Sequence, residues 1–131
     1  MTASSQAPSS NQDRPALDDV LQTVQAFLDE VTSKLSGESK YHAQVSSYLL
    51  SIGVRELHQG PAAAAKERAE LAQVLGHDDT LEELRIEASA AIRAGRLDNR
   101  WDEMVDLVLG HITAKAAIVR PDHLAKQHRP T

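Results

Sequence analysis

The sequence predicts an all-α protein, a compact bundle of about five helices. Apolar residues recur at spacings of three and four along several stretches, which is the pattern of an amphipathic helix. Glycine or proline stands at the end of each stretch, where helices commonly stop. No segment shows sustained alternation with β-branched enrichment, so we expect no strand. The hydrophobic fraction of 41% and the charged fraction of 25% are typical of a chain that folds around one core.

The two ends of the chain differ from its middle. Residues 1–12 are rich in Ser, Ala, Gln and Asn without periodicity and predict a disordered leader. Residues 122–131 predict a flexible basic tail, which leaves residues 13–121 as one helical domain. We read no signal peptide and no run long enough to cross a membrane, and cysteine is absent. These features suit the cytoplasm.

The first helix is expected from about Pro15 to Leu35. Asp13-Arg14-Pro15 supplies a capping carboxylate and a proline suited to the first turn. One apolar stripe follows at helical spacing, formed by Leu17, Val20, Leu21, Val24, Phe27, Leu28, Val31 and Leu35. Gly37 then ends the helix.

The second and third helices are predicted on either side of Gly60-Pro61. Ser39 can cap the second helix, which carries apolar residues on two faces and therefore belongs in the middle of a bundle. Gln59-Gly60-Pro61 should end it, because glycine can adopt the left-handed cap and proline can open the next helix. The third helix then runs from Pro61 to Leu75 and ends at Gly76.

Two more helices complete the prediction. Thr80 and Glu83 have the spacing of a capping box at the start of the fourth helix, which ends at Gly95. The last helix runs from about Trp101 to Val119. The expected core consists of residues at the centres of the apolar stripes: Leu21, Val24, Leu28, Val45, Leu49, Ile52, Leu84, Ile92, Val105, Val108 and Ile112.

Composition and motifs argue against most catalytic functions. The glycines are single, so no phosphate-cradling loop and no Gly-x-Ser-x-Gly elbow occurs, and we predict no catalytic residue. Without cysteine there is neither a thiolate metal site nor a Cys nucleophile. The net charge of -5 disfavours nucleic acid as a partner, and an aromatic content of 3% is too low for a base-stacking platform.

Two local clusters have both a functional and a structural interpretation. His77-Asp78-Asp79 is the best local metal candidate, but adjacent polar residues before a helix usually cap it, so we predict no metal. Arg55 and Glu56 lie between the apolar stripes of the second helix. We favour a structural ion pair with another helix over a catalytic carboxylate, because such charged pairs are often only structural.

Basic residues form the candidate contact site. Arg85, Arg93, Arg96 and Arg100 surround the turn at Gly95, and Lys115 lies on the inward side of the last helix. In an acidic chain such a local reversal of charge can mark an anion or an acidic partner surface, although a solvated face is the commoner explanation. For Lys115, packing of its stem with an exposed ammonium group competes with contact to a phosphate. The predicted anion or partner contacts are Arg93, Arg96, Arg100 and Lys115.

An ordered series of segments resembles a known family. These segments are Asp13-Arg14-Pro15, Tyr41-His42-Ala43-Gln44-Val45, Val54-Arg55-Glu56-Leu57 before Gly60-Pro61, Leu75-Gly76, Ile92-Arg93-Ala94-Gly95-Arg96-Leu97-Asp98 and Lys115-Ala116-Ala117-Ile118-Val119-Arg120-Pro121. Together they resemble small bacterial proteins of otherwise unassigned function that are similar to the small subunit of the hydroxyacyl-CoA kinase of levulinate catabolism. The resemblance spans residues 13–121.

The resemblance implies a non-catalytic accessory subunit in a kinase complex. Its partner would be a large subunit with an aminoglycoside-phosphotransferase-like fold, which phosphorylates the hydroxyl group of a gamma-hydroxyacyl-CoA. ATP, magnesium and the catalytic Asp would belong to that partner, so this chain would carry no cofactor of its own. It would order or complete the partner's acyl-CoA site at the shared interface. It could do so by burying an apolar face against a lid, or by presenting arginines to the CoA phosphates.

Other functions stay open at this point. The chain is alternatively a stand-alone acyl-CoA-binding module, or a self-associating helical scaffold that forms a homo-oligomer. Ligand binding by the isolated protein would separate the first of these from an accessory subunit. A metal enzyme is a distant fourth.

Overall fold

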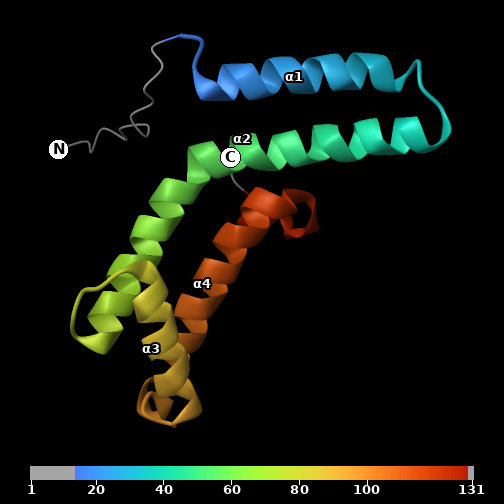
Figure 1. Cartoon of the computed structure of the whole chain (residues 1–131). Coiled ribbons are helices and arrows are strands. Elements are labelled where there is room, and N and C mark those ends of the chain that lie inside the picture. The colour runs from blue at the N-terminus through green and yellow to red at the C-terminus, as the bar shows by residue number, and fades with distance from the viewer. Residues whose placement is uncertain (1–13, 130–131) are drawn as a thin grey trace. The chain divides into compact units, whose positions relative to one another are not determined.

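The computed structural model describes residues 14–129, and all regular structure within them is helical (Figure 1). The four α-helices are α1 (Leu17–Thr32), α2 (Gly37–Leu75), α3 (Leu81–Arg93) and α4 (Trp101–Val119). Three 3₁₀ helices of three residues each cover Asp98–Arg100, Pro121–His123 and Lys126–His128. The all-α prediction is confirmed. None of the described helices combines the length and the hydrophobicity needed to cross a membrane.

The number of helices differs from the prediction because α2 continues through Gly60-Pro61. The predicted end at this point was wrong, and the expected second and third helices are one helix of 39 residues. Proline has no N–H to donate to the carbonyl of Leu57, which costs about 3 kcal/mol in a helix interior. The loss is confined to one position, and the run Ala62–Ala65 directly after it has the highest helix propensity.

Contacts along the chain divide it into two units, residues 1–59 and 60–131, and each is described separately. In the first unit α1 lies antiparallel to the first part of α2 (Figure 1). Asp18 is 2.9 Å from the ring of His58, and the Ser47 hydroxyl donates to the carboxylate of Asp29. The predicted leader and the predicted capping carboxylate of Asp13 lie outside the described residues.

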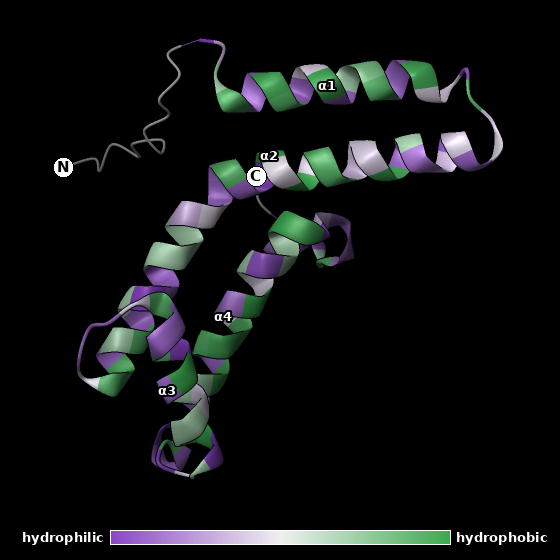
Figure 2. Cartoon of the chain, in the orientation of Figure 1, coloured by the Kyte–Doolittle hydropathy of each residue, from purple (hydrophilic) through white to green (hydrophobic). Residues whose placement is uncertain are grey.

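The first unit buries little apolar surface. Hydrophobic and hydrophilic residues alternate along α1, as Figure 2 shows. Yet α1 has no buried residue, and Phe27 is 62% exposed. Two helices give each other only one face to cover, so the unit leaves apolar side chains in contact with solvent.

The second unit contains the better core. Leu84 of α3 is fully buried against Leu71 of α2, and Ala88 lies beside them. Two other core residues in this unit are small, Ala91 and Ala117, and the larger ones are Val74, Met104 and Ile118. Small side chains let helix backbones approach closely, which explains how so few large residues close this core.

The predicted core was largely wrong. Of the eleven expected residues only Leu84 is buried, while three are half-buried: Leu21, Leu28 and Ile52. The other seven are exposed: Val24, Val45, Leu49, Ile92, Val105, Val108 and Ile112. Periodicity identifies an apolar face, but whether a neighbour covers that face depends on how many helices surround it.

The start of α3 follows the predicted capping pattern with one change. The Thr80 hydroxyl accepts a hydrogen bond from the backbone N–H of Glu83 at 3.2 Å. The N–H of Thr80 itself donates to the carboxylate of Asp79 at 2.7 Å. In a capping box the side chain of the third helical residue accepts this hydrogen bond from the N–H of the capping residue. Here Asp79 accepts it in place of Glu83.

Candidate functional site

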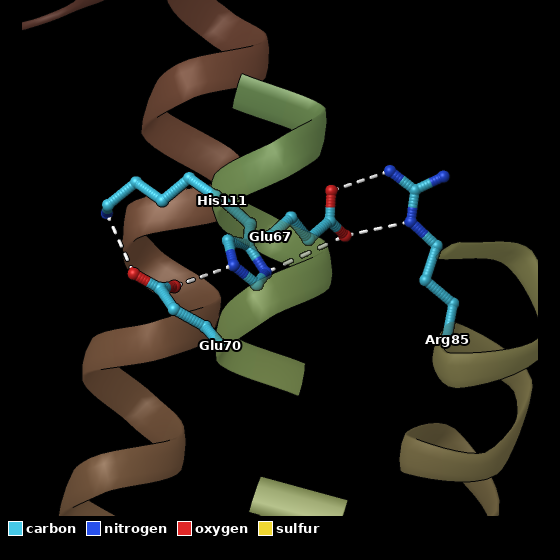
Figure 3. Close-up of polar contacts among 5 residues, drawn as sticks. Glu67, Glu70, Arg85 and His111 are labelled. Carbon is cyan, nitrogen blue, oxygen red and sulfur yellow. Dashed lines mark hydrogen bonds and ion pairs between the residues drawn. The ribbon is translucent and has the colours of Figure 1, made fainter. Parts of the chain in front are cut away.

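A polar network joins the three helices of the second unit (Figure 3). Glu67 of α2 lies at its centre and is only 7% exposed. Arg85 of α3 donates from Nε and Nη2 to the two carboxylate oxygens of Glu67, at 2.8 and 2.6 Å. His111 of α4 places Nδ1 3.7 Å from Glu67 and Nε2 3.0 Å from Glu70. One carboxylate thus links α2 to both of its neighbours.

The charges of the network compensate one another. The bidentate hydrogen bonds from Arg85 lower the pKa of Glu67, against the effect of burial. Hydrogen bonding from Lys66, whose Nζ lies 3.0 Å away, lowers the pKa of Glu70, with a further contribution from His111. Both carboxylates are therefore ionised at neutral pH. An ionised acid that already accepts from a guanidinium is a poor proton acceptor, so the network suits a structural role better than acid–base catalysis.

A small groove of about 260 Å³ adjoins the network. Its polar end is formed by Glu67, Arg85, His111 and Lys115. The rest of its wall is mostly apolar and comes from all three helices of the unit: Leu71, Ala88, Ser89, Ile92, Met104, Leu107, Val108 and Ile112. Such a combination of an apolar wall and a few polar groups is typical of ligand sites.

A larger groove of about 370 Å³ lies where α3 passes into α4. Apart from Asp98 it is lined by apolar side chains: Ile92, Leu97, Trp101, Met104, Val105, Val108 and Leu109. Trp101 is 62% exposed and Leu109 56%. Three residues line both grooves, so the two are neighbours: Ile92, Met104 and Val108.

The turn beside the larger groove has the predicted geometry. Gly95 has a φ of +74°, in the left-handed region, as predicted for the end of this helix. The N–H of Arg96 bonds to the carbonyl of Ala91 at 3.0 Å, and the N–H of Gly95 to that of Ile92 at 3.1 Å. These two bonds form a Schellman motif, which directs the chain away from α3.

The four predicted contact residues do not form one site. Arg93 and Arg96 are exposed beside the Gly95 turn, and neither guanidinium group forms a hydrogen bond or an ion pair with another described residue. Arg100 instead binds Glu103 through two hydrogen bonds of 2.8 and 2.6 Å and donates to the carbonyl of Val74 at 3.1 Å. Its guanidinium therefore ties the start of α4 to α2.

Lys115 belongs to the smaller groove. It lies about 21 Å along α4 from Trp101, at a rise of 1.5 Å per residue. Its positive charge contributes to the lowered pKa of Glu67.

The network itself was not predicted from the sequence. Glu67 shares a helical face with Leu71 and Val74, at spacings of four and seven, and both of these are buried. This spacing is the signal that could have identified Glu67 as an internal charge. Arg85 was grouped with the arginines of the Gly95 turn, because its spatial partner lies 18 positions away in the sequence.

In the first of the two clusters left open by the sequence, His77 and Asp78 have separate partners. His77 lies 2.7 Å from Glu87, which raises the pKa of His77, and Asp78 accepts from Arg68 at 3.0 Å. Residues 14–129 contain no group of three or more His, Asp or Glu arranged to hold a metal ion. In α2, Arg55 is half-buried and Glu56 is exposed.

Comparison with known proteins gives one match. Residues 33–123 match the family described as "Domain of unknown function (DUF6285)". No curated protein matches the chain, and no solved structure does. The matched segment contains α2, α3 and α4 and begins directly after α1, so the network and both grooves lie inside it.

Proposed function

The chain belongs to the DUF6285 family of domains of unknown function, and we propose that it is a non-catalytic accessory subunit that binds a larger kinase subunit. The observation that supports this proposal most directly is the apolar groove around Trp101. Residues Leu97, Trp101, Val105 and Val108 follow one another at spacings of four, four and three. An amphipathic helix or an apolar ridge of a partner protein would fit such a surface.

Trp101 has the properties of an interface anchor. Tryptophan is among the residues that contribute most to binding when an interface buries them. Here its side chain is largely exposed in a small protein that has only one tryptophan. Exposed apolar side chains gathered in one groove favour a partner, whereas single exposed apolar residues require no explanation.

The kind of partner is proposed from the family resemblance. It would be the large subunit with an aminoglycoside-phosphotransferase-like fold, which phosphorylates the hydroxyl group of a gamma-hydroxyacyl-CoA in hydroxy or keto acid catabolism in the bacterial cytoplasm. ATP and magnesium would bind to that subunit. The absence of a phosphate-cradling loop from this sequence supports that division of labour.

Arg93 and Arg96 suggest the polarity of the partner surface. Both side chains are exposed and form no ion pair among residues 14–129, and their chain neighbours Ile92 and Leu97 line the larger groove. Acidic residues on the kinase subunit would complement them and steer association. Reversing both to Glu should therefore weaken assembly in a salt-dependent manner while leaving helicity unchanged.

The test is co-purification of this chain from its native host, followed by identification of any phosphotransferase-like protein that accompanies it. We expect a complex with kinase activity that neither protein has alone. Trp101→Asp should abolish the complex, whereas Ile86→Asp should not, because Ile86 is 57% exposed but does not line the groove. Equal binding by wild type and Trp101→Asp, or robust turnover by this chain alone, would contradict the proposal.

A stand-alone acyl-CoA-binding module is the second candidate. It is favoured by the position of the exposed Arg93 and Arg96 beside an apolar groove, which would suit CoA phosphates and an acyl chain. Calorimetric titration of the isolated protein with acyl-CoA distinguishes the candidates. Saturable binding without the kinase subunit, together with failure to co-purify, would replace the first proposal by this one.

A further inference from the structure

The polar end of the smaller groove has unused hydrogen-bond donors. Arg85 donates hydrogen bonds to Glu67 from Nε and from one N–H of Nη2. Its guanidinium has three further N–H groups, and none of them bonds to residues 14–129. Its side chain is 44% exposed. Lys115 and Ser89 line the same groove, and neither side chain makes a hydrogen bond within the described chain.

The acceptors around this end are already occupied. Both oxygens of Glu67 accept from Arg85, and Glu70 accepts from Lys66 and His111. Each of these carboxylates therefore has a cation beside it. Lys115 forms no ion pair within the described chain, and its charge acts on Glu67 only from a longer distance. An anionic group would accept hydrogen bonds from the free donors of Arg85 and Lys115.

The remainder of the groove favours an apolar chain of limited length. Its apolar lining includes Ile92, Val108 and Ile112, together with Leu71 and Leu107. Its volume of about 260 Å³ is below the roughly 300–1,000 Å³ of pockets that hold drug-sized ligands. The ligand should therefore be small, with one charged end.

We propose that this groove binds a small amphiphilic anion. A carboxylate or phosphate group would accept hydrogen bonds from Arg85 and Lys115, and a short apolar chain would lie against Ile92, Val108 and Ile112. This site goes beyond the proposed function, because it requires no kinase subunit. It also differs from the larger groove, whose occupant we propose to be a protein.

The first test titrates the full, ¹⁵N-labelled chain with four ligands that share a six-carbon chain. Hexanoate and hexyl phosphate should each shift the amide signals of residues that line the smaller groove, and the tighter of the two identifies the anionic group. Hexanol and hexylammonium should bind at least about tenfold more weakly, because a charge-assisted hydrogen bond is worth about that factor. Equal binding of hexanol and hexanoate, or no saturable shift with either anion, would overturn the proposal.

The second test compares two variants with the same change in net charge. Lys115→Gln should weaken hexanoate binding about tenfold. Lys126→Gln is the matched control, because Lys126 is exposed and does not line the groove, and it should leave binding unchanged. Acetate, which lacks the apolar chain, should compete poorly. Equal effects of the two variants, or no effect of Lys115→Gln, would refute a site at this position.

Discussion

Removing Arg85 should cost more stability than neutralising Glu67, although Arg85 is the more exposed partner. The variant Arg85→Met leaves the Glu67 carboxylate, 7% exposed, without its guanidinium partner and with the ring of His111 3.7 Å away. Breaking a buried pair from one side costs 3–5 kcal/mol, and the partial exposure here favours the lower end, about 3 kcal/mol. The variant Glu67→Gln leaves Arg85, whose side chain is 44% exposed and recovers water, so we expect about 1 kcal/mol.

Urea denaturation followed by tryptophan fluorescence measures both variants. Trp101 is the only tryptophan of the chain and lies in the same unit as the network, so it reports on the relevant unfolding. Since Arg85 lowers the pKa of Glu67 below its ordinary value of 4.5, the carboxylate stabilises the fold above that pH. This contribution is lost as the pH falls through the lowered pKa, so wild type and Glu67→Gln should converge in acid. A larger cost for Glu67→Gln than for Arg85→Met at pH 7 would refute the reasoning.

Three further predictions concern packing, backbone geometry and titration. Leu84→Ala should cost about 2.7–5 kcal/mol in chemical denaturation and Leu49→Ala less than about 1 kcal/mol, because the first side chain is fully buried and the second is 59% exposed; equal costs would contradict the core described above. Gly95→Ala should destabilise by about 1–2 kcal/mol because of its positive φ, whereas Gly110→Ala, in a helix with free space around it, should stabilise by about 0.5–1 kcal/mol; the thermal midpoints should shift in opposite directions. The pKa of His77, measured by NMR, should lie above its ordinary value of 6.5. Its ion pair with Glu87 should stabilise the fold below that pH and lose this effect as the pH rises through the raised pKa. An ordinary pKa for His77 would argue against the pair.

Local signals in the sequence predicted several helix ends in the second unit, but they were wrong before α2, where Gly37 begins the helix that Ser39 was expected to cap. The capping role of Thr80, the left-handed Gly95 and the end of a helix at Gly76 each depend on a few neighbouring residues, and the structure confirms all three. The bounds of α4 also agree with the predicted range. In each case the physical cause, a free N–H or a positive φ, lies within one turn of the residue that reveals it.

The sequence did not predict features that depend on contacts between residues far apart in the chain. Pro61 carries the same local signal whether it opens a helix or lies inside one, and the sequence could not show that α2 would continue. Likewise Leu49 and Leu84 occupy similar apolar stripes, yet one is exposed and the other fully buried. The difference arises from how many helices lie around each stripe, which periodicity does not contain.

In the candidate site, too, local properties were predicted from the sequence and long-range pairings were not. Arg93 and Arg96 were identified from charge alone and are exposed, as expected for a contact surface. The pairing of Arg85 with Glu67 spans 18 positions, and that of His111 with Glu70 spans 41. Side chains so far apart meet only through the packing of three helices, so no spacing rule would have predicted them.

The continuity of α2 has a consequence for cooperativity. The helix spans the division between the two units, and Pro61, which donates no backbone hydrogen bond, lies next to that division. Helix unfolding is cooperative because neighbouring backbone hydrogen bonds stabilise one another. We therefore expect unfolding that begins in the first part of α2 to stop near Pro61, where one such bond is missing. We therefore expect hydrogen exchange to reveal two protection levels within one helix, with slower exchange after Pro61, where Leu71 and Val74 are buried. A calorimetric trace of this small protein should accordingly be broader than a single two-state transition.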